Sequence, residues 1–130
     1  MGKLREAGFF RELEHGNPQG PVLSEHVCAT SQESEVEIIH YLKNGILFVA
    51  CPSVVTDVLS KSPRHIGAPH ILTDGVWQWP NDYAYYVDTY HVKVEEEFIL
   101  HMKRNQWQIP NLEHEVLVAL DNDEFDRNDA

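Results

Sequence analysis

The strongest local constraint on this chain is the pair Asp74-Gly75, which lies between two short apolar runs. The first run is 71–73 and the second is 76–79. A type I′ turn needs positive φ at both central residues, and Asp-Gly adopts this conformation readily, so the pattern predicts a β-hairpin centred on this pair. Side chains alternate along a strand, so Trp77 and Trp79 share one face, which we expect to lie in the core.

A helix is predicted upstream of the hairpin, over residues 34–44. Ser34 followed by Glu37 has the form of a capping box, and Asn44-Gly45 supplies the end of the helix. The helical spacing places three apolar side chains on one face, which we expect to be buried. These are Val36, Ile39 and Leu42.

Two further helices are predicted downstream of the hairpin. Pro80 favours a helix start, and residues 83–90 then place three tyrosines and Val87 on one face. Glu95-Glu96-Glu97 puts negative charge at the beginning of the last helix, where the helix dipole favours it, and Asn105 ends that helix. Its expected buried stripe is Phe98, Ile99 and Met102.

The remaining segments have weaker patterns. We expect a short helix over 4–15 because apolar residues recur at 4, 7, 10 and 13. Residues 46–51 read as a strand, 54–59 as a strand or a helical turn, and 61–69 as a loop. Residues 106–109 have the pattern of a short strand, and 115–120 fit either a strand or a last short helix.

Together these elements predict an α+β fold, with helices packed on a small, mostly antiparallel sheet. We expect a single domain over residues 1–120. Residues 121–130 read DNDEFDRNDA and hold too little apolar surface to offset their ordering entropy, so we expect an acidic, solvated tail. The first residues carry charge where a signal peptide needs an apolar stretch, so we expect a cytoplasmic protein.

The charge of the chain restricts its partners. Lys and Arg number 10 against 21 Asp and Glu, and the formal net charge is −11. Such a charge repels nucleic-acid phosphate and anionic lipid, so neither is expected as a direct ligand, and it attracts a basic protein. Solubility alone is the alternative explanation for the acidity.

No motif for catalysis or metal binding is present, so we expect no enzyme activity and no cofactor. The histidine pairs His65/His70 and His91/His101 have no recognised ligand spacing. Cys28 and Cys51 lie among apolar residues, and we expect two buried free thiols. A small enzyme or metal-binding protein that uses scattered histidines remains an alternative.

Aromatic residues are dense between positions 77 and 90, and acidic residues lie close to them. On the predicted helix Tyr85 points away from Tyr83 and Tyr86, which makes it the best candidate for an exposed aromatic contact. Aromatic side chains beside carboxylates suit a basic protein surface. The predicted partner-binding residues are Asp82, Tyr85, Asp88, Glu95 and Glu96.

The block TDGVWQWP at 73–80, with DYAYYV at 82–87 and Glu97-Phe98, resembles a group of small bacterial proteins that share a TDG-W-W-P…YYV…EF pattern. Tyr90-His91-Val92 fits the same pattern, and the resemblance covers about residues 36–110. These proteins resemble immunity proteins, which are cytosolic inhibitors encoded beside secreted polymorphic toxins. This chain departs from the pattern where Val94-Glu95-Glu96 replaces an expected Leu-Pro.

The resemblance implies an inhibitor that binds a toxin and blocks its active site. The net charge of −11 predicts that this toxin is basic and acts on nucleic acid, because such a toxin needs a positive groove for phosphate. The resemblance implies no defined site residues. A protein-interaction module with a partner other than a toxin, such as a self-associating subunit, is a further alternative, and the residues leave the oligomeric state open.

Overall fold

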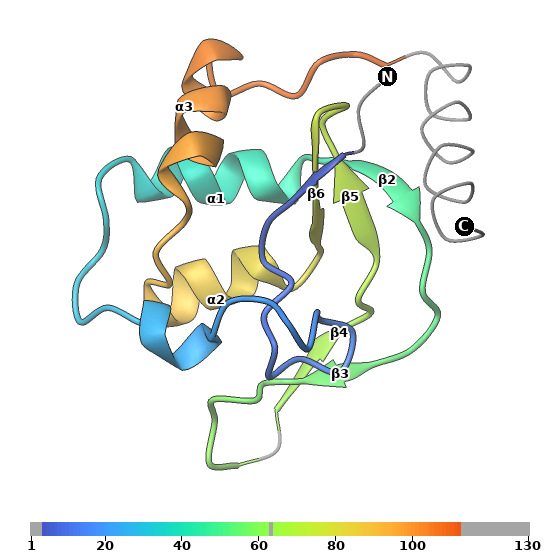
Figure 1. Cartoon of the computed structure of the whole chain (residues 1–130), viewed down its shortest axis with the longest axis vertical. Coiled ribbons are helices and arrows are strands. Elements are labelled where there is room, and N and C mark those ends of the chain that lie inside the picture. The colour runs from blue at the N-terminus through green and yellow to red at the C-terminus, as the bar shows by residue number, and fades with distance from the viewer. Residues whose placement is uncertain (1–3, 63, 113–130) are drawn as a thin grey trace.

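The computed structural model describes residues 4–62 and 64–112, and Figure 1 shows the arrangement of its elements. The main sheet has four strands in the order β1-β6-β5-β2. Strand β1 pairs parallel with β6, and the other two pairings are antiparallel. The strands are β1 (Arg5–Glu6), β2 (Ile46–Val49), β5 (Ile71–Thr73) and β6 (Trp77–Pro80).

Three α-helices, one 3-10 helix and a second, two-stranded sheet complete the described domain. The helices are η1 (Leu23–His26), α1 (Glu35–Lys43), α2 (Tyr83–Tyr90) and α3 (Glu96–Arg104), and the small sheet consists of β3 (Val55–Thr56) and β4 (His65–Gly67). Helix α1 contacts both α2 and α3. The predicted α+β class and single domain are confirmed, whereas residues 115–120 and the acidic tail lie outside the described residues.

The core is centred on the two tryptophans of β6. Trp77 and Trp79 are 2% and 0% exposed, and their rings lie 4.6 and 5.3 Å from the ring of Phe98 in α3. The indole nitrogen of Trp79 donates a hydrogen bond to the Leu42 carbonyl at 3.0 Å, which joins β6 to α1. The core position predicted for the two tryptophans is therefore confirmed.

The hairpin β5–β6 forms as predicted, but its turn differs. The amide of Asp74 donates to the carbonyl of Trp77 at 3.2 Å, which leaves Gly75 and Val76 as the turn residues. Gly75 has φ +98°, whereas Asp74 does not have positive φ, so the type I′ turn centred on Asp74-Gly75 is wrong. The carboxylate of Asp74 instead accepts the amides of Val76 and Trp77, at 2.9 and 2.7 Å, and holds the turn closed.

The N-terminal segment is the clearest failure of the helical spacing. Leu4, Ala7, Phe10 and Leu13 are all buried as predicted, but residues 4–15 form β1 and a series of turns instead of a helix. The amides of Arg5 and Ala7 donate to carbonyls flanking and within β6, at 2.9 and 3.1 Å. The free edge of β6 thus outcompetes a local helix, because it pairs the backbone and buries the same side chains.

Helix α1 confirms the predicted helix, but not its details. Val36 is 78% exposed, and the buried face consists of Ile38, Tyr41 and Leu42 together with Glu35. The capping box is absent, because Ser34 has φ +60° and its side chain makes no cap hydrogen bond. The amide of Gln32 is bound by the carboxylate of Glu35 instead, at 3.1 Å.

Five other expectations concern shorter segments, the last two helices and the cysteines. Helices α2 and α3 form as predicted, with Phe98 and Met102 fully buried. The predicted loop 61–69 contains β4, and the segment 54–59 forms a strand only at β3. The predicted strand 106–109 is wrong, since Gln106 and Trp107 have φ values of +55° and +61°. Cys28 and Cys51 are free, as expected, but half-buried where full burial was predicted.

Candidate partner-binding surface

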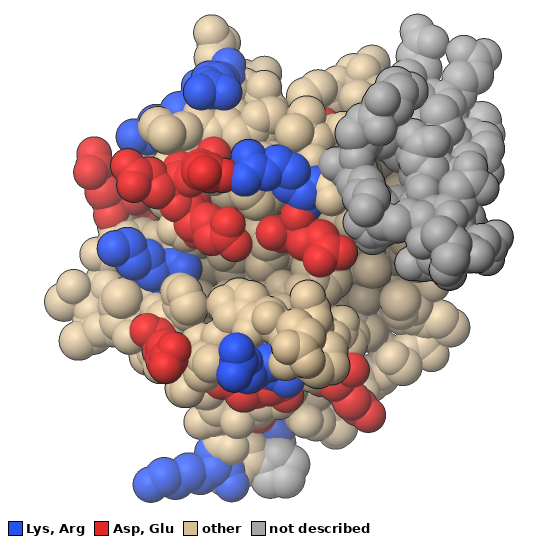
Figure 2. Space-filling model, viewed as in Figure 1, with Lys and Arg blue, Asp and Glu red and all other residues tan. Residues whose placement is uncertain are grey.

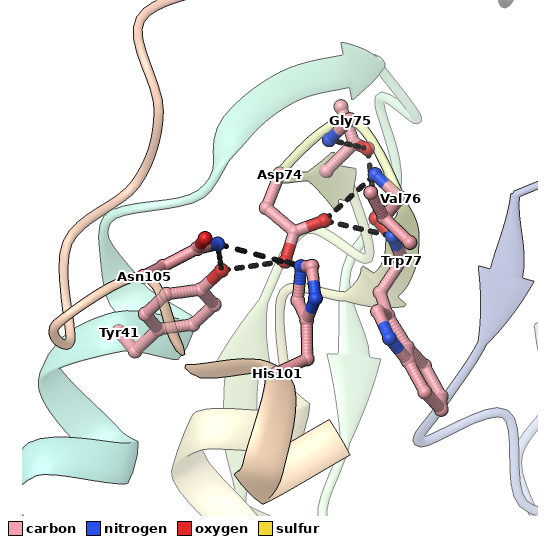
Figure 3. Close-up of polar contacts among 8 residues, drawn as sticks. Tyr41, Asp74, Gly75, Val76, Trp77, His101 and Asn105 are labelled. Carbon is pink, nitrogen blue, oxygen red and sulfur yellow. Dashed lines mark hydrogen bonds and ion pairs between the residues drawn. The ribbon is translucent and has the colours of Figure 1, made fainter. Parts of the chain in front are cut away.

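Four acidic residues are buried, and their carboxylates bind other parts of the protein. Asp74 has four partners, which come from α1, α3 and its own turn (Figure 3). One of its oxygens accepts the Tyr41 hydroxyl at 2.5 Å and lies 3.1 Å from Nε2 of His101. The other accepts the two turn amides, while Asn105 donates to the Tyr41 hydroxyl at 2.9 Å. Burial, followed by the hydrogen bond to Asp74, raises the pKa of Tyr41 far above its ordinary value.

Asp57 is bonded in a similar way by α2. The hydroxyls of Tyr85 and Tyr90 each donate to the same Asp57 oxygen at 2.6 Å, and two backbone amides bind the other oxygen. Burial alone would raise the pKa of Asp57, but these hydrogen bonds outweigh it, and the pKa lies below its ordinary value. The two tyrosines therefore hold the turn after β3 against α2.

Two of the predicted partner-binding residues, Asp82 and Tyr85, are engaged in contacts within the protein. Asp82 is 1% exposed and pairs with Nε2 of His15 at 3.0 Å, so its prediction as a direct contact is wrong. Tyr85 is half-buried, and its hydroxyl is occupied by Asp57, so it is not the freely exposed aromatic residue that was predicted. The fourth buried acid, Glu35, binds Nδ1 of His91 at 2.8 Å and joins α1 to the end of α2.

The residues of the TDG…YYV block thus bind other segments of the fold. Asp74 of the hairpin binds α1 and α3, and the α2 tyrosines bind Asp57. Such contacts specify the fold, because each one satisfies a buried polar group that would otherwise be left without a partner. They leave little of the block exposed for recognition.

A different group of carboxylates faces solvent at the start of α3. Glu95 and Glu96 are exposed there, as predicted, and the parallel pairing of β1 with β6 brings Glu6 to the same place. Figure 2 shows that Asp and Glu side chains gather in one band across this face, near the start of α3. We call Glu6, Glu95, Glu96 and Glu97 the acidic surface. Asp88 is also exposed, but it lies on α2 and outside this group.

One arginine lies beside the acidic surface. Arg5 forms an ion pair with Glu97, and its guanidinium lies 4.4 Å from the ring centroid of Trp77. Partial burial raises the pKa of Glu95, Arg5 opposes this increase, and the neighbouring Glu97 adds to it. The charge of His26 also acts against the increase, but burial and Glu97 prevail, so the pKa of Glu95 lies above its ordinary value.

Two hollows adjoin the acidic surface. One, of about 170 Å³, lies between Glu6 and Glu95, and we call it the acidic hollow. The other, of about 220 Å³, lies along α3, where Ile99 and Leu100 form an apolar floor beside Glu96. Lys93 and Lys103 also line this second hollow, so it combines apolar area with charges of both signs. Apolar area bordered by polar and charged side chains is the usual composition of a protein-binding surface.

The histidines do not converge. No group of three or more metal-ligating side chains occurs within residues 4–62 and 64–112, and His15, His91 and His101 each pair with a buried carboxylate. In the same part of the chain, no helix combines the length and apolar character that crossing a membrane requires.

The sequence reasoning found Glu95 and Glu96 but missed Glu6 and the hollow beside it. Glu6 was placed in a helix, and nothing local indicates that it pairs with a strand more than seventy residues away. No protein-family model, curated protein or solved structure matches this chain.

Proposed function

We propose that this protein is an immunity-type inhibitor, which binds a basic bacterial toxin in the cytoplasm and blocks its active site. The observation that carries the proposal is the acidic surface, where four glutamates from β1 and the start of α3 gather, with Arg5 paired to Glu97 and with Lys93 and Lys103 beside Glu96. The resemblance of the 73–98 block to immunity proteins supports the same conclusion.

The chemistry of the partner follows from this charge. A toxin that cleaves or modifies nucleic acid needs a positive groove for phosphate. Carboxylates on a compact protein can occupy that groove as phosphate mimics, and their field accelerates encounter with it. The apolar floor at Ile99 and Leu100 adds contact area that would slow dissociation.

The elements that carry the acidic surface are anchored in the core. Phe98 and Met102 are fully buried and pack α3 against the core, and β1 is hydrogen-bonded along β6. The backbone that presents the carboxylates is therefore already positioned before a partner arrives. A pre-organised surface loses less conformational freedom on binding, which favours tight inhibition.

The proposal is tested by protection of growth. The reading frames that flank the gene are searched for a toxin domain, which is then induced in cells that also produce this protein, and survival is counted. Wild-type protein should restore growth, and the double variant Glu95→Lys/Glu96→Lys should reduce survival by at least tenfold, because it places positive charge against a basic groove.

Glu14→Lys is the matched control, since Glu14 is an exposed acid that lines a separate small cavity beside β3. It changes the net charge in the same direction and should still protect. Toxicity unaffected by the wild-type protein would contradict the proposed function. Equal loss of protection in the double variant and the control would contradict the assignment to the acidic surface.

A further inference from the structure

The acidic hollow has walls of two kinds. Glu6 on β1 and Glu95 before α3 line it from two elements far apart in the sequence, and Phe9, Pro21 and Asn17 form the rest of its rim. Both carboxylate-bearing residues are exposed, whereas Phe9 is half-buried. The hollow thus offers negative charge beside an aromatic and apolar surface.

The fold builds this shape through Gly8. Its φ is +80°, and a Cβ at this position would lie 2.6 Å from the ring of Tyr83. Only glycine allows the chain to pass so close to α2 and then turn away from β6. The turn is held by the amide of Arg11, which donates to the carbonyl of Pro21 at 3.0 Å, and this closes the wall opposite Glu95.

The free protein neutralises the hollow only in part. The charges of Arg5 and His26 act on Glu95, but Arg5 pairs with Glu97 and lies over Trp77, and the Arg11 guanidinium donates to the carbonyl of Gly20. Glu6 and Glu95 carry like charge and line the same space, so both would attract a cation that entered.

Phe9 supplies an independent indication of a cation. Its ring belongs neither to the core cluster nor to the hydrophobic side chains packed against that cluster, and it makes no ring–ring contact within the described residues. Phe9 is half-buried and lines the acidic hollow, and no other described aromatic ring covers it. Aromatic faces attract cations, and guanidinium stacks on them most readily.

We propose that the acidic hollow binds one arginine side chain of the partner, with its guanidinium between Glu6 and Glu95 and its plane against Phe9. Arginine fits better than lysine, because its planar group presents donors on several edges to two carboxylates and loses hydration more easily. The inference rests on the proposed function only in naming a toxin as the source of that arginine.

The binding itself is tested without a toxin. Nα-acetyl-arginine amide is titrated into the ¹⁵N-labelled full chain, and amide chemical shifts are followed by NMR. The uncharged isostere Nα-acetyl-citrulline amide is the control ligand. We expect saturable shifts at the amides of residues 6–9 and 95–97 with the arginine derivative alone. Shifts of equal size with both compounds, or spread evenly over all acidic residues, would overturn the proposal.

Three substitutions separate a built site from general acidity. Glu6→Gln and Glu95→Gln should each weaken binding of the arginine derivative by about three- to fivefold, and Phe9→Leu should weaken it by a similar factor with no change in charge. Glu14→Gln, which removes the same charge elsewhere, should leave binding unchanged. If Phe9→Leu binds as the wild type does, the aromatic contact is wrong.

The two proposals fail separately. If the hollow binds the arginine derivative but the protein protects no cell from the adjacent toxin, the proposed function fails and the site remains. If the protein protects cells, and the Glu6→Gln, Glu95→Gln and Phe9→Leu variants protect equally well, the function remains and the arginine site is overturned.

Discussion

Asp74 lies in the hairpin turn, and Glu95 lies just before α3. The fold gives these two carboxylates opposite surroundings. Asp74 is 2% exposed and accepts hydrogen bonds from a hydroxyl and two amides, beside a histidine. Glu95 is exposed, and Glu6 and Glu97 lie near it. The comparison teaches that the formal charge of −11 counts two unlike populations.

The buried carboxylates act on stability, and the exposed ones remain available for recognition. A buried charge must be bonded or paired, because desolvation without a partner is costly. Asp57, Asp74, Asp82 and Glu35 each have such partners from other segments of the chain. Four of the 14 acidic residues that the structure describes are thus committed to the fold, so net charge overstates what a partner can contact.

Removing the buried carboxylate of Asp74 should have the largest effect on stability. Asp74→Ala leaves Tyr41, His101 and two turn amides without their acceptor, and we expect the free energy of unfolding to fall by about 3–5 kcal/mol. Urea denaturation followed by tryptophan fluorescence measures it. Asp88→Ala, at an exposed acid on α2, should change the free energy by less than about 0.5 kcal/mol. Equal effects at the two positions would show that buried and exposed carboxylates contribute alike to stability.

A smaller loss is expected around Asp57. Tyr85→Phe and Tyr90→Phe each remove one hydroxyl that donates to this carboxylate, and each should lower the free energy of unfolding by about 1.5 kcal/mol at pH 7. Urea denaturation of the two single variants and the double variant measures this loss. Additive effects would contradict a shared acceptor, since residues that bind one group are expected to be coupled.

The pH dependence of stability sharpens the same point. The pKa of Asp57 is lowered in the folded protein, so its stabilisation is present above the unfolded pKa of about 4 and is lost as pH falls through the folded value. We therefore expect wild-type protein to lose more stability between pH 6 and pH 3 than the Tyr85→Phe/Tyr90→Phe variant does. Denaturant titrations at several pH values provide the measurement, and identical slopes would show that these hydroxyls do not lower the pKa.

At alkaline pH, stability is expected to fall as the pH rises, because a tyrosine hydroxyl that donates to Asp57 loses its proton. The hydrogen bond to Asp57, followed by burial, raises the pKa of Tyr90 to about 12. Its stabilisation is present below the unfolded value of about 10 and is lost as pH rises towards the folded value. In an ultraviolet titration of tyrosinate, the Tyr90→Phe variant should lack one phenol that ionises at high pH. Tyr41→Phe, which removes the hydroxyl bound to Asp74, is the comparison.

The exposed carboxylates should show their effect in association. With a basic toxin, the association rate should fall about tenfold between low and 0.5 M salt, because screening removes long-range attraction. Glu95→Gln/Glu96→Gln should lower the rate at low salt and flatten its salt dependence. Stopped-flow mixing at several salt concentrations measures both. A rate indifferent to salt would mean that the acidity serves solubility alone.

The smallest effect should be that of the exposed carboxylates on folding. The variant Glu6→Gln/Glu95→Gln/Glu96→Gln should keep its free energy of unfolding within about 0.5 kcal/mol of the wild type, since none of these side chains satisfies a buried group. Urea denaturation beside Asp74→Ala provides the contrast. A loss of several kcal/mol would show that the carboxylates of the acidic surface contribute to folding.

Local spacing in the sequence was sufficient for α2, α3 and the hairpin. Each of these elements satisfies its backbone within a few residues, so helical or strand periodicity specifies it directly. The pattern also identified the buried residues of segment 4–13, because apolar side chains are buried whatever the backbone does. It assigned the wrong backbone there, since β1 depends on β6, more than seventy residues away.

The sequence by itself determined the net charge, the elements from β6 to α3 and most of the apolar residues that leave water. Only the tertiary structure decided which carboxylates are free. Asp82 and Tyr85 look like exposed contacts in sequence, but His15 and Asp57 reach them from other segments. Glu6 meets Glu95 only because a parallel strand pairing crosses the chain. Whether a polar group is a structural bond or a binding contact depends on which donors lie within about 3 Å of it, and those donors arrive through long-range packing that no local pattern encodes.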